Sequence, residues 1–380
     1  MRPAGACEAH AEVDWFAGSW WLSARELLRD VESRPFLPVA SASYQLGDAT
    51  FHAVVDHPLP LEAFSKLYGD CAVTDEDASP APAIRCTIRR SFEPQLVVLT
   101  FQEGAPPDPA GAAYNLLRPT LAVPPFRVYD SPLKGWRLAG GATGAVLAAG
   151  DGHVLMHPKL IPPEFLVEYL VGITLGAQPW TLPIHGASLR MGDAGVVLVG
   201  ASRAGKTTTS LHLAARGHTL LGDEIALIRL STNELVPFRR AVNVRPGPHR
   251  EELAGLLGLR DQVDESPFDL MWGRRDRISQ LFPGQPARPT PLRAVFFLGG
   301  FADRPSAEPY RLTLDQEDVF DWITTPEIAY CSWGLSPSRR AFRLLVLRQA
   351  LARVPCWILR LGPPRETVEL IELTMEGLSC

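Results

Sequence analysis

VVLVGASRAGKTTTSLHLAARG, residues 196–217, contains an apolar run, a glycine-rich turn and an amphipathic segment in that order. The spacing G-x-x-x-x-G-K-[S/T] is met by Gly200, Gly205, Lys206 and Thr207. The apolar run before this turn predicts a strand, and the segment after it predicts a helix. Glycines in such a turn let backbone N–H groups surround phosphate oxygens, and the helix N-terminus adds partial positive charge. The stretch therefore predicts a nucleotide-binding loop, and a glycine-rich turn formed by chance is the alternative.

The residue types in this loop indicate which ligands it would hold. Lys206 would bring a positive charge to the β and γ phosphates, and the hydroxyl of Thr207 would ligate Mg²⁺. ATP and Mg²⁺ are therefore the expected cofactors. The residues expected to contact the nucleotide form one continuous run: Gly200, Ala201, Ser202, Arg203, Ala204, Gly205, Lys206, Thr207 and Thr208.

Other motifs narrow the class of nucleotide-binding protein. The segment ISQLFPGQ at 278–285 is the nearest approach to an LSGGQ signature but does not match it, which argues against an ABC-type ATPase. The sequence has no NKxD motif of the kind that reads guanine in GTPases. Asp223 follows Lys206 by only 17 residues, a close spacing that favours a compact kinase-like fold.

Composition and charge exclude several broad classes. The chain has 380 residues, of which 46% are hydrophobic and 21% charged, as in ordinary folded proteins. The net charge of −5 provides no basic field for nucleic acid, so no nucleic-acid partner is expected. The acidic N-terminus does not resemble a secretion signal, and no apolar run approaches the length of a membrane span. We expect a cytoplasmic protein without a membrane partner.

The local composition and the predicted elements change near residue 160, which suggests two domains. Residues 1–160 mix short β-like runs with acidic and Pro/Gly-rich spacers, which favours an N-terminal α+β domain that binds substrate or a partner. Residues 161–380 are expected to form the P-loop kinase domain, in an α/β fold. Buried strands are predicted at 292–300 and 354–362. The helix predicted at 336–354 repeats arginines on one face, which is expected to be its solvent side.

Residues 183–228, PIHGASLRMGDAGVVLVGASRAGKTTTSLHLAARGHTLLGDEIALI, resemble the catalytic core of the HPr kinase/phosphorylase family, whose fold is related to that of phosphoenolpyruvate carboxykinase. The resemblance rests on elements in the same order: the HG strand with His185, a hairpin, the loop with Ser202 at its third position, and RGHTLLGD followed by an acid. It is strong over about 45 residues. Glu224 replaces the family's second aspartate, Arg203 replaces a loop glycine, and the segment that contacts HPr is absent.

The resemblance implies roles for several side chains. Asp223 would accept the proton of the attacking hydroxyl or help to hold Mg²⁺, and Glu224 would take the other role; we expect Asp223 to be the base and Glu224, with Thr207, to hold the metal. His185 is expected near the acidic pair, with a structural role as the equal alternative. Arg240 could neutralise charge on the transferred phosphoryl group, although a solvated arginine is the simpler interpretation.

These inferences predict a P-loop kinase that transfers the γ-phosphate of ATP to a hydroxyl, of Ser or Thr in a peptide or protein. The divergence from HPr recognition resembles HPr-kinase-related proteins that modify ribosomally made peptides, including lasso peptides. A kinase of a small metabolite and a non-catalytic ATP-binding regulator are the alternatives. The resemblance also implies a homo-oligomer.

Overall fold

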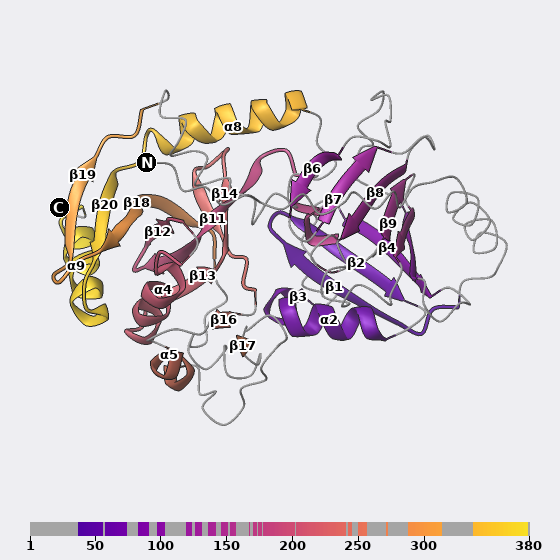
Figure 1. The fold of residues 1–380 in the computed structure, drawn as a ribbon, viewed down its shortest axis with the longest axis horizontal. Helices are drawn as coiled ribbons and strands as arrows, with labels where there is room; N and C mark the ends of the chain where they lie inside the picture. The colour runs from indigo at the N-terminus through magenta and orange to yellow at the C-terminus, as the bar shows by residue number, and fades with distance from the viewer. Residues whose placement is uncertain are drawn as a thin grey trace, which may run out of the picture.

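The computed structural model shows two large β-sheets with helices packed on them (Figure 1). A two-stranded sheet of β16 (Asn243–Val244) and β17 (Met271–Trp272) accompanies them. The residues that the structure describes are 37–55, 58–73, 83–90, 97–102, 119–123, 126–130, 136–141, 146–150, 153–156, 167, 170–172, 174–176, 178–201, 203–240, 242–244, 250–256, 271–272, 288–313 and 337–378.

The first sheet has the strand order β3-β1-β2-β4-β5-β10-β9-β8-β7-β6. Its neighbouring strands are antiparallel except for the parallel pair β2 and β4. Helix α2 (Leu59–Tyr68) packs on this sheet through Phe64, whose ring stacks on Tyr44 and Phe51 at centroid distances of 4.7 and 5.3 Å. The strands are β1 (Ala40–Leu46), β2 (Ala49–Val55), β3 (Ala72–Val73), β4 (Ala83–Arg90), β5 (Val97–Gln102), β6 (Pro119–Val123), β7 (Phe126–Asp130), β8 (Trp136–Gly141), β9 (Val146–Gly150) and β10 (His153–Met156).

The second sheet has the order β12-β11-β14-β15-β18-β20-β19, and β13 pairs with β11. Because β12 also pairs with β18, the strands β12, β11, β14, β15 and β18 close into a ring. The strands are β11 (Thr181–Met191), β12 (Ala194–Val199), β13 (Thr219–Gly222), β14 (Ile225–Arg229), β15 (Glu234–Val236), β18 (Thr290–Phe301), β19 (Ser306–Tyr310) and β20 (Cys356–Leu361).

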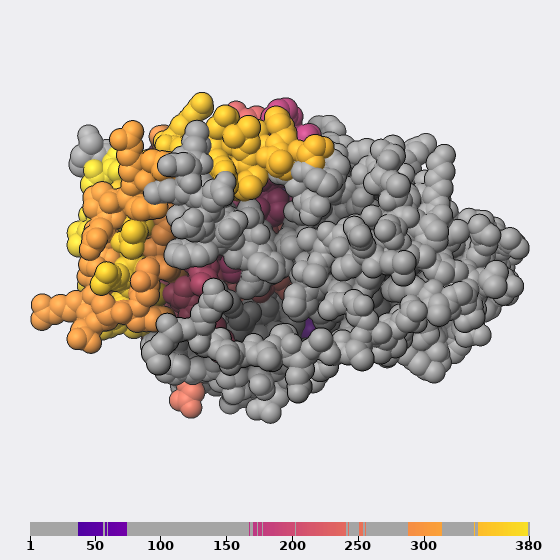
Figure 2. Space-filling view, turned by 45° about the horizontal axis from the view of Figure 1, so that its top comes forward, coloured from indigo at the N-terminus to yellow at the C-terminus, as the bar shows by residue number. Residues whose placement is uncertain are grey.

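Helices cover both faces of the second sheet. On one face α4 (Lys206–Ala215), α5 (Arg250–Leu256) and α9 (Pro364–Glu376) share a core with β12, β18 and β20. On the other face, α8 (Pro337–Leu351) contributes Leu347 and Leu351 to a second core. In Figure 2 the orange and yellow C-terminal segments lie on the left, and yellow atoms continue along the top of the view toward its middle. A mixed sheet with helices on both faces belongs to the α/β class, as the sequence predicts.

The strand that carries the glycine-rich loop lies inside the second sheet. β12 is antiparallel to β11 and parallel to β18, and β18 is in turn parallel to β20. Parallel neighbours end at the same edge of a sheet, so β12, β18 and β20 all deliver their carboxyl ends to one edge. The strand, loop and helix predicted at 196–217 are all present, and so are the strands expected at 292–300 and 354–362.

One arginine of α8 corrects the expected solvent face of that helix. Arg343 is only 7% exposed, although the sequence predicts a solvent-facing row of arginines. Its guanidinium donates hydrogen bonds to the carbonyl oxygens of Gln178 and Thr181 at 2.8 and 2.9 Å, and to that of Gly176 at 3.2 Å. A guanidinium has five N–H donors, so it can serve several converging carbonyls that would otherwise be buried without partners.

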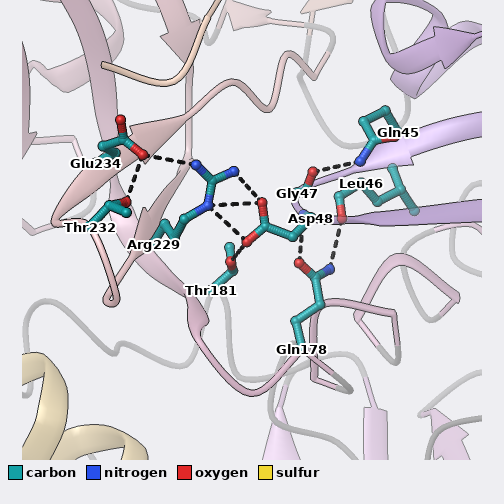
Figure 3. A network of polar contacts seen from close by, with 9 residues as sticks. All are labelled: Gln45, Leu46, Gly47, Asp48, Gln178, Thr181, Arg229, Thr232 and Glu234. Carbon is teal, nitrogen blue, oxygen red and sulfur yellow. Dashed lines mark hydrogen bonds and ion pairs between the residues drawn. The ribbon is translucent and has the colours of Figure 1, made fainter. Parts of the chain in front are cut away.

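A polar network connects the two sheets at the turn between β1 and β2 (Figure 3). Asp48 in this turn accepts hydrogen bonds from the guanidinium of Arg229 on β14 and from the hydroxyl of Thr181 on β11. The side chain of Gln178 donates to the carbonyl of Leu46 at 2.7 Å and accepts from the backbone N–H of Asp48 at 2.8 Å. The two parts of the chain are thus in direct contact. The domain boundary at residue 160 stays a prediction.

Within the described part of the chain, no helix combines the length and the apolar character that crossing a membrane requires.

Candidate functional site

The glycine-rich loop joins the end of β12 to the start of α4. Gly205 precedes the helix with φ +97°, in the left-handed region that favours glycine. A Cβ on Gly205 would lie 2.5 Å from Cδ1 of Leu361, so the position also has no room for a side chain. A Cβ on Gly200 would lie 3.0 Å from the Cβ atoms of Ala204 and Leu298. Gly205 is therefore favoured by conformation and by space, and Gly200 by space alone.

Among the remaining loop positions, the structure describes all except Ser202. Ala201 and Arg203 are exposed, and Arg203 has φ +67°, an uncommon conformation for a residue with a side chain. Thr208 lies in the first turn of α4. Ser202, which the sequence also places in contact with nucleotide, lies outside the described residues.

Lys206 points back into the loop. Its side chain is 7% exposed, and Nζ donates hydrogen bonds to the carbonyl oxygens of Gly200 and Ala201 at 2.8 and 2.9 Å. These bonds keep the ammonium at the loop rather than in solvent. A positive charge and the first N–H groups of α4 therefore share one small region, which suits an anion.

Asp223 lies directly beside the first turn of α4. The hydroxyl of Thr207 donates to its carboxylate, at 3.0 Å from Oδ2 and 3.2 Å from Oδ1. Burial raises the pKa of Asp223 to about 6, with a further increase from the charge of Glu224. The hydrogen bond from Thr207 and the charge of Lys206 oppose this increase. The carboxylate is thus buried, close to a cation, and titrates near neutral pH.

Asp223 and Glu224 form the tight turn between β13 and β14. Glu224 adopts φ +67°, and its carbonyl accepts a hydrogen bond from the N–H of Gly186 at 3.2 Å. A Cβ on Gly222 would lie 2.6 Å from the carbonyl oxygen of Ile225, so this turn also needs glycine. A side-chain residue in the left-handed region stores strain, which is common at functional sites.

The carboxylate of Glu224 is directed to Arg240. Oε2 of Glu224 and Nη1 of Arg240 are 2.6 Å apart, and the Arg240 side chain is only 11% exposed. Arg240 is therefore held beside the acidic turn, which favours the functional interpretation over a solvated arginine. Thr207 is hydrogen-bonded to Asp223, whereas Glu224 is bonded to Arg240, and the expected metal pair of Thr207 and Glu224 stays a prediction.

His185 lies where the resemblance implies, next to the acidic turn. It is 3% exposed on β11, and its backbone pairs with Ile225, the residue that follows Glu224. A fully buried position in a strand also suits a structural role, so the choice between the two roles expected for His185 stays open.

The segment before Arg240 contacts helix α2 and the short 3-10 helix Gly69–Cys71 that follows it, which the sequence does not reveal. The thiol of Cys71 donates to the carbonyl of Arg239 at 3.3 Å, and the rings of Tyr68 and Phe238 have centroids 5.5 Å apart. Arg239 also donates from Nε to the carbonyl of Leu220 at 2.9 Å. The acidic turn is therefore connected through residues 238–240 to α2 and to the short 3-10 helix after it. These contacts join residues far apart in the chain, and no local motif marks them.

Comparisons with known proteins add little to this geometry. No protein-family model matches the chain, and no curated protein matches it either. A solved structure of the Hpr(Ser) kinase/phosphatase from Coxiella burnetii aligns with 16% identity and a TM-score of 0.26, over 52% of this chain and 94% of that chain. This TM-score is too low to carry an argument about fold or function.

Proposed function

We propose that this protein is a P-loop kinase of the HPr-kinase-related kind, which transfers the γ-phosphate of ATP to a hydroxyl group. The observation that carries the proposal is the hydrogen bond between Thr207 and the buried Asp223, directly after a glycine-rich loop that contains Lys206. A cation for the phosphates, a hydroxyl that ligates Mg²⁺ and a carboxylate that accepts a proton are recurring parts of phosphoryl-transfer sites.

The loop supplies the binding part of this function. Lys206 would exchange its bonds to the carbonyls of Gly200 and Ala201 for the oxygens of the β and γ phosphates. The backbone N–H groups of the loop and of the first turn of α4 would complete the cradle. The exposed Arg203 stands where the family has glycine, so its guanidinium can add a charge beside the phosphates.

Thr207 and Asp223 fit a magnesium ion. A hydroxyl and a carboxylate are hard oxygen donors, and Mg²⁺ in proteins commonly keeps few protein ligands alongside phosphate oxygens and water. We assign Thr207 as the protein ligand, with Asp223 as the carboxylate beside it. The ion would neutralise charge on the polyphosphate. Glu224 is not assigned to the metal because its carboxylate binds Arg240.

Asp223 is also proposed as the general base. In the reaction the acceptor oxygen forms a bond to the γ-phosphorus, the bond from that phosphorus to the β–γ bridging oxygen breaks, and the acceptor proton goes to Asp223. A carboxylate whose pKa is about 6 is ionised at neutral pH and still holds a proton better than an ordinary aspartate. Arg240, held by Glu224, would stabilise charge on the transferred group.

The acceptor is proposed to be Ser or Thr of a peptide or protein, as in the tailoring of ribosomally made peptides. The part of the chain with α2 and the first sheet is the proposed acceptor-binding or partner-binding part, because Tyr68 at the end of α2 and Cys71 just after it contact the segment that leads to Arg240. A small-metabolite acceptor and a regulator that binds ATP without transferring phosphate remain the competing proposals.

The test is transfer of label from γ-labelled ATP with Mg²⁺ to a pool of Ser/Thr peptides. Asp223→Asn should abolish transfer while ATP still binds, and Lys206→Ala should lose binding and transfer. The matched control is Asp193→Asn, the same change at an exposed turn between β11 and β12. Wild-type protein that binds ATP but labels neither peptides nor small hydroxylated compounds would contradict the kinase proposal and favour the regulator.

A further inference from the structure

A large aromatic side chain lies exposed beside the glycine-rich loop. Phe301 is the last residue of β18, and it is 70% exposed. β18 is the parallel neighbour of β12, so its end lies at the sheet edge from which the loop leaves. Covering this ring with a ligand would be favourable, and Phe301 differs from the other exposed apolar side chains in standing next to a candidate ligand site.

An irregularity in β18 places Phe301 on the loop side of the sheet. Leu298 pairs with Leu359 and Phe301 pairs with Leu361, so β18 advances by three residues where β20 advances by two. This extra residue is a β-bulge, and Gly300 within it has φ +109°. Phe301 therefore shares the face of its partner Leu361, which belongs to the core under α4.

The distance from Phe301 to the loop is short. A Cβ on Gly205 would lie 3.8 Å from both Cε1 and Cζ of the Phe301 ring, and 2.5 Å from Cδ1 of Leu361. The ring edge thus lies beside Gly205, the residue that directly precedes α4 within the proposed phosphate cradle. A nucleotide held by its phosphates at this loop would therefore bind next to the exposed ring.

We propose that the base of the bound nucleotide stacks on the exposed ring of Phe301. This inference rests on the proposed nucleotide-binding function and names the subsite for the base. Aromatic stacking on a base gives a large contact area and fixes the orientation of the nucleotide. The bulge at Gly300 then has a role, because it turns the aromatic residue toward the loop.

Because the proposed contact is stacking, it limits how well this subsite can distinguish one base from another. Every base has an aromatic face, so stacking alone separates ATP from GTP weakly. At the neighbouring strand end, Gly362 is engaged with Thr367: its N–H donates to Oγ1 at 3.0 Å, and its carbonyl accepts from the same hydroxyl at 3.2 Å. The N–H of Gly362 is therefore not offered to the edge of a base, whereas its carbonyl keeps a second lone pair. ATP and GTP are expected to bind with similar affinity.

The experiment compares the binding of MgATP, MgGTP and magnesium tripolyphosphate by calorimetry. Phe301→Ala should weaken both nucleotides by about 5-fold to 100-fold and leave tripolyphosphate unchanged, because only the nucleotides have a base. Phe301→Trp should retain nucleotide binding. The matched control is Phe342→Ala, which removes another exposed phenylalanine, on α8 and 54% exposed, and should change nothing.

The outcomes separate this inference from the proposed function. If Phe301→Ala binds ATP as well as the wild type does, or loses tripolyphosphate equally, the base subsite is wrong. If in that case Lys206→Ala still loses all three ligands, the nucleotide loop stands. A wild-type protein that binds none of the three ligands overturns both proposals. Thermal unfolding of Phe301→Ala checks that the variant is folded.

Discussion

Thr207 donates its hydroxyl hydrogen to the buried carboxylate of Asp223, at 3.0 Å from Oδ2. This bond joins the first turn of α4 to the turn between β13 and β14, two elements that share no backbone pairing. It opposes the effect of burial on the pKa of Asp223. Raising the pH ionises the buried Asp223, which should lower the stability of the fold and raise the transfer activity, because the ionised carboxylate is the form that acts as the base.

The first prediction concerns Asp223→Asn. Since the folded-state pKa of about 6 lies above the unfolded value, the ionised carboxylate destabilises the fold, with a cost that grows as pH rises from about 4 and is complete above about 6. The substitution should remove transfer activity and raise the free energy of unfolding at about pH 7.5, on the order of 2 kcal/mol. Urea unfolding measures this gain, which should vanish below about pH 4. A loss of stability at neutral pH would contradict the burial argument.

The second prediction distinguishes the residue that binds Mg²⁺ from the residue that holds Arg240 in place. Glu224→Gln should lower kcat by about tenfold to a hundredfold, because Arg240 loses its ionic partner, while the Mg²⁺ concentration for half-maximal activity stays the same. Thr207→Val, which removes the assigned ligand, should raise that concentration. A magnesium titration of activity compares the two variants. If Glu224→Gln needs far more Mg²⁺, the expectation from the sequence that Glu224 holds the metal is correct.

The third prediction uses two glycines with the same backbone conformation. Gly205 and Gly217 have φ +97° and +99°, but a Cβ on Gly217 would meet nothing within 4 Å, whereas one on Gly205 would collide with Leu361. Gly217→Ala should therefore cost only the left-handed strain, about 1–2 kcal/mol. Gly205→Ala should cost more and also abolish nucleotide binding. Thermal unfolding and calorimetry test both, and equal effects would show that the collision with Leu361 is unimportant.

The fourth prediction concerns the contact between the sheets. Burial alone would raise the pKa of Asp48, but the hydrogen bonds from Arg229 and Thr181 and the charge of Arg229 outweigh burial and lower it. A lowered pKa stabilises the fold above the unfolded value of about 3.9, and the contribution is lost as pH falls through the folded value. Asp48→Asn should cost about 1–2 kcal/mol at neutral pH, a figure reduced for partial exposure.

Urea unfolding of Asp48→Asn and the wild type at about pH 7 and about pH 3 tests this expectation, with the exposed Asp193→Asn as control. The difference between the two proteins should shrink at the lower pH. A difference that is the same at both pH values would mean that the ionised form of Asp48 is not what stabilises the contact.

Local patterns predict the elements of the site and fail for its long-range contacts. The loop, α4 and the acidic turn follow from residues 196–224, because glycine spacing and apolar runs fix short segments of backbone. The burial of Arg343 could not be predicted, since its carbonyl partners lie more than 160 residues earlier in the chain. The position of Phe301 depends on a bulge, which only the pairing with β20 reveals. The bond between Arg240 and Glu224 likewise depends on how the chain returns after β15.

β12 pairs with one strand that is close to it in the sequence and with another that is far from it in the sequence, and this has a consequence during protein synthesis. Its first partner, β11, comes directly before it in the chain. Its second partner, β18, comes much later, and there Gly195 pairs with Leu292. A ribosome therefore releases the complete loop and α4 long before the strand that flanks β12 on its second side. Until β18 leaves the exit tunnel, the nascent chain has one unpaired side on the loop strand, and folding of the nucleotide site must wait for it.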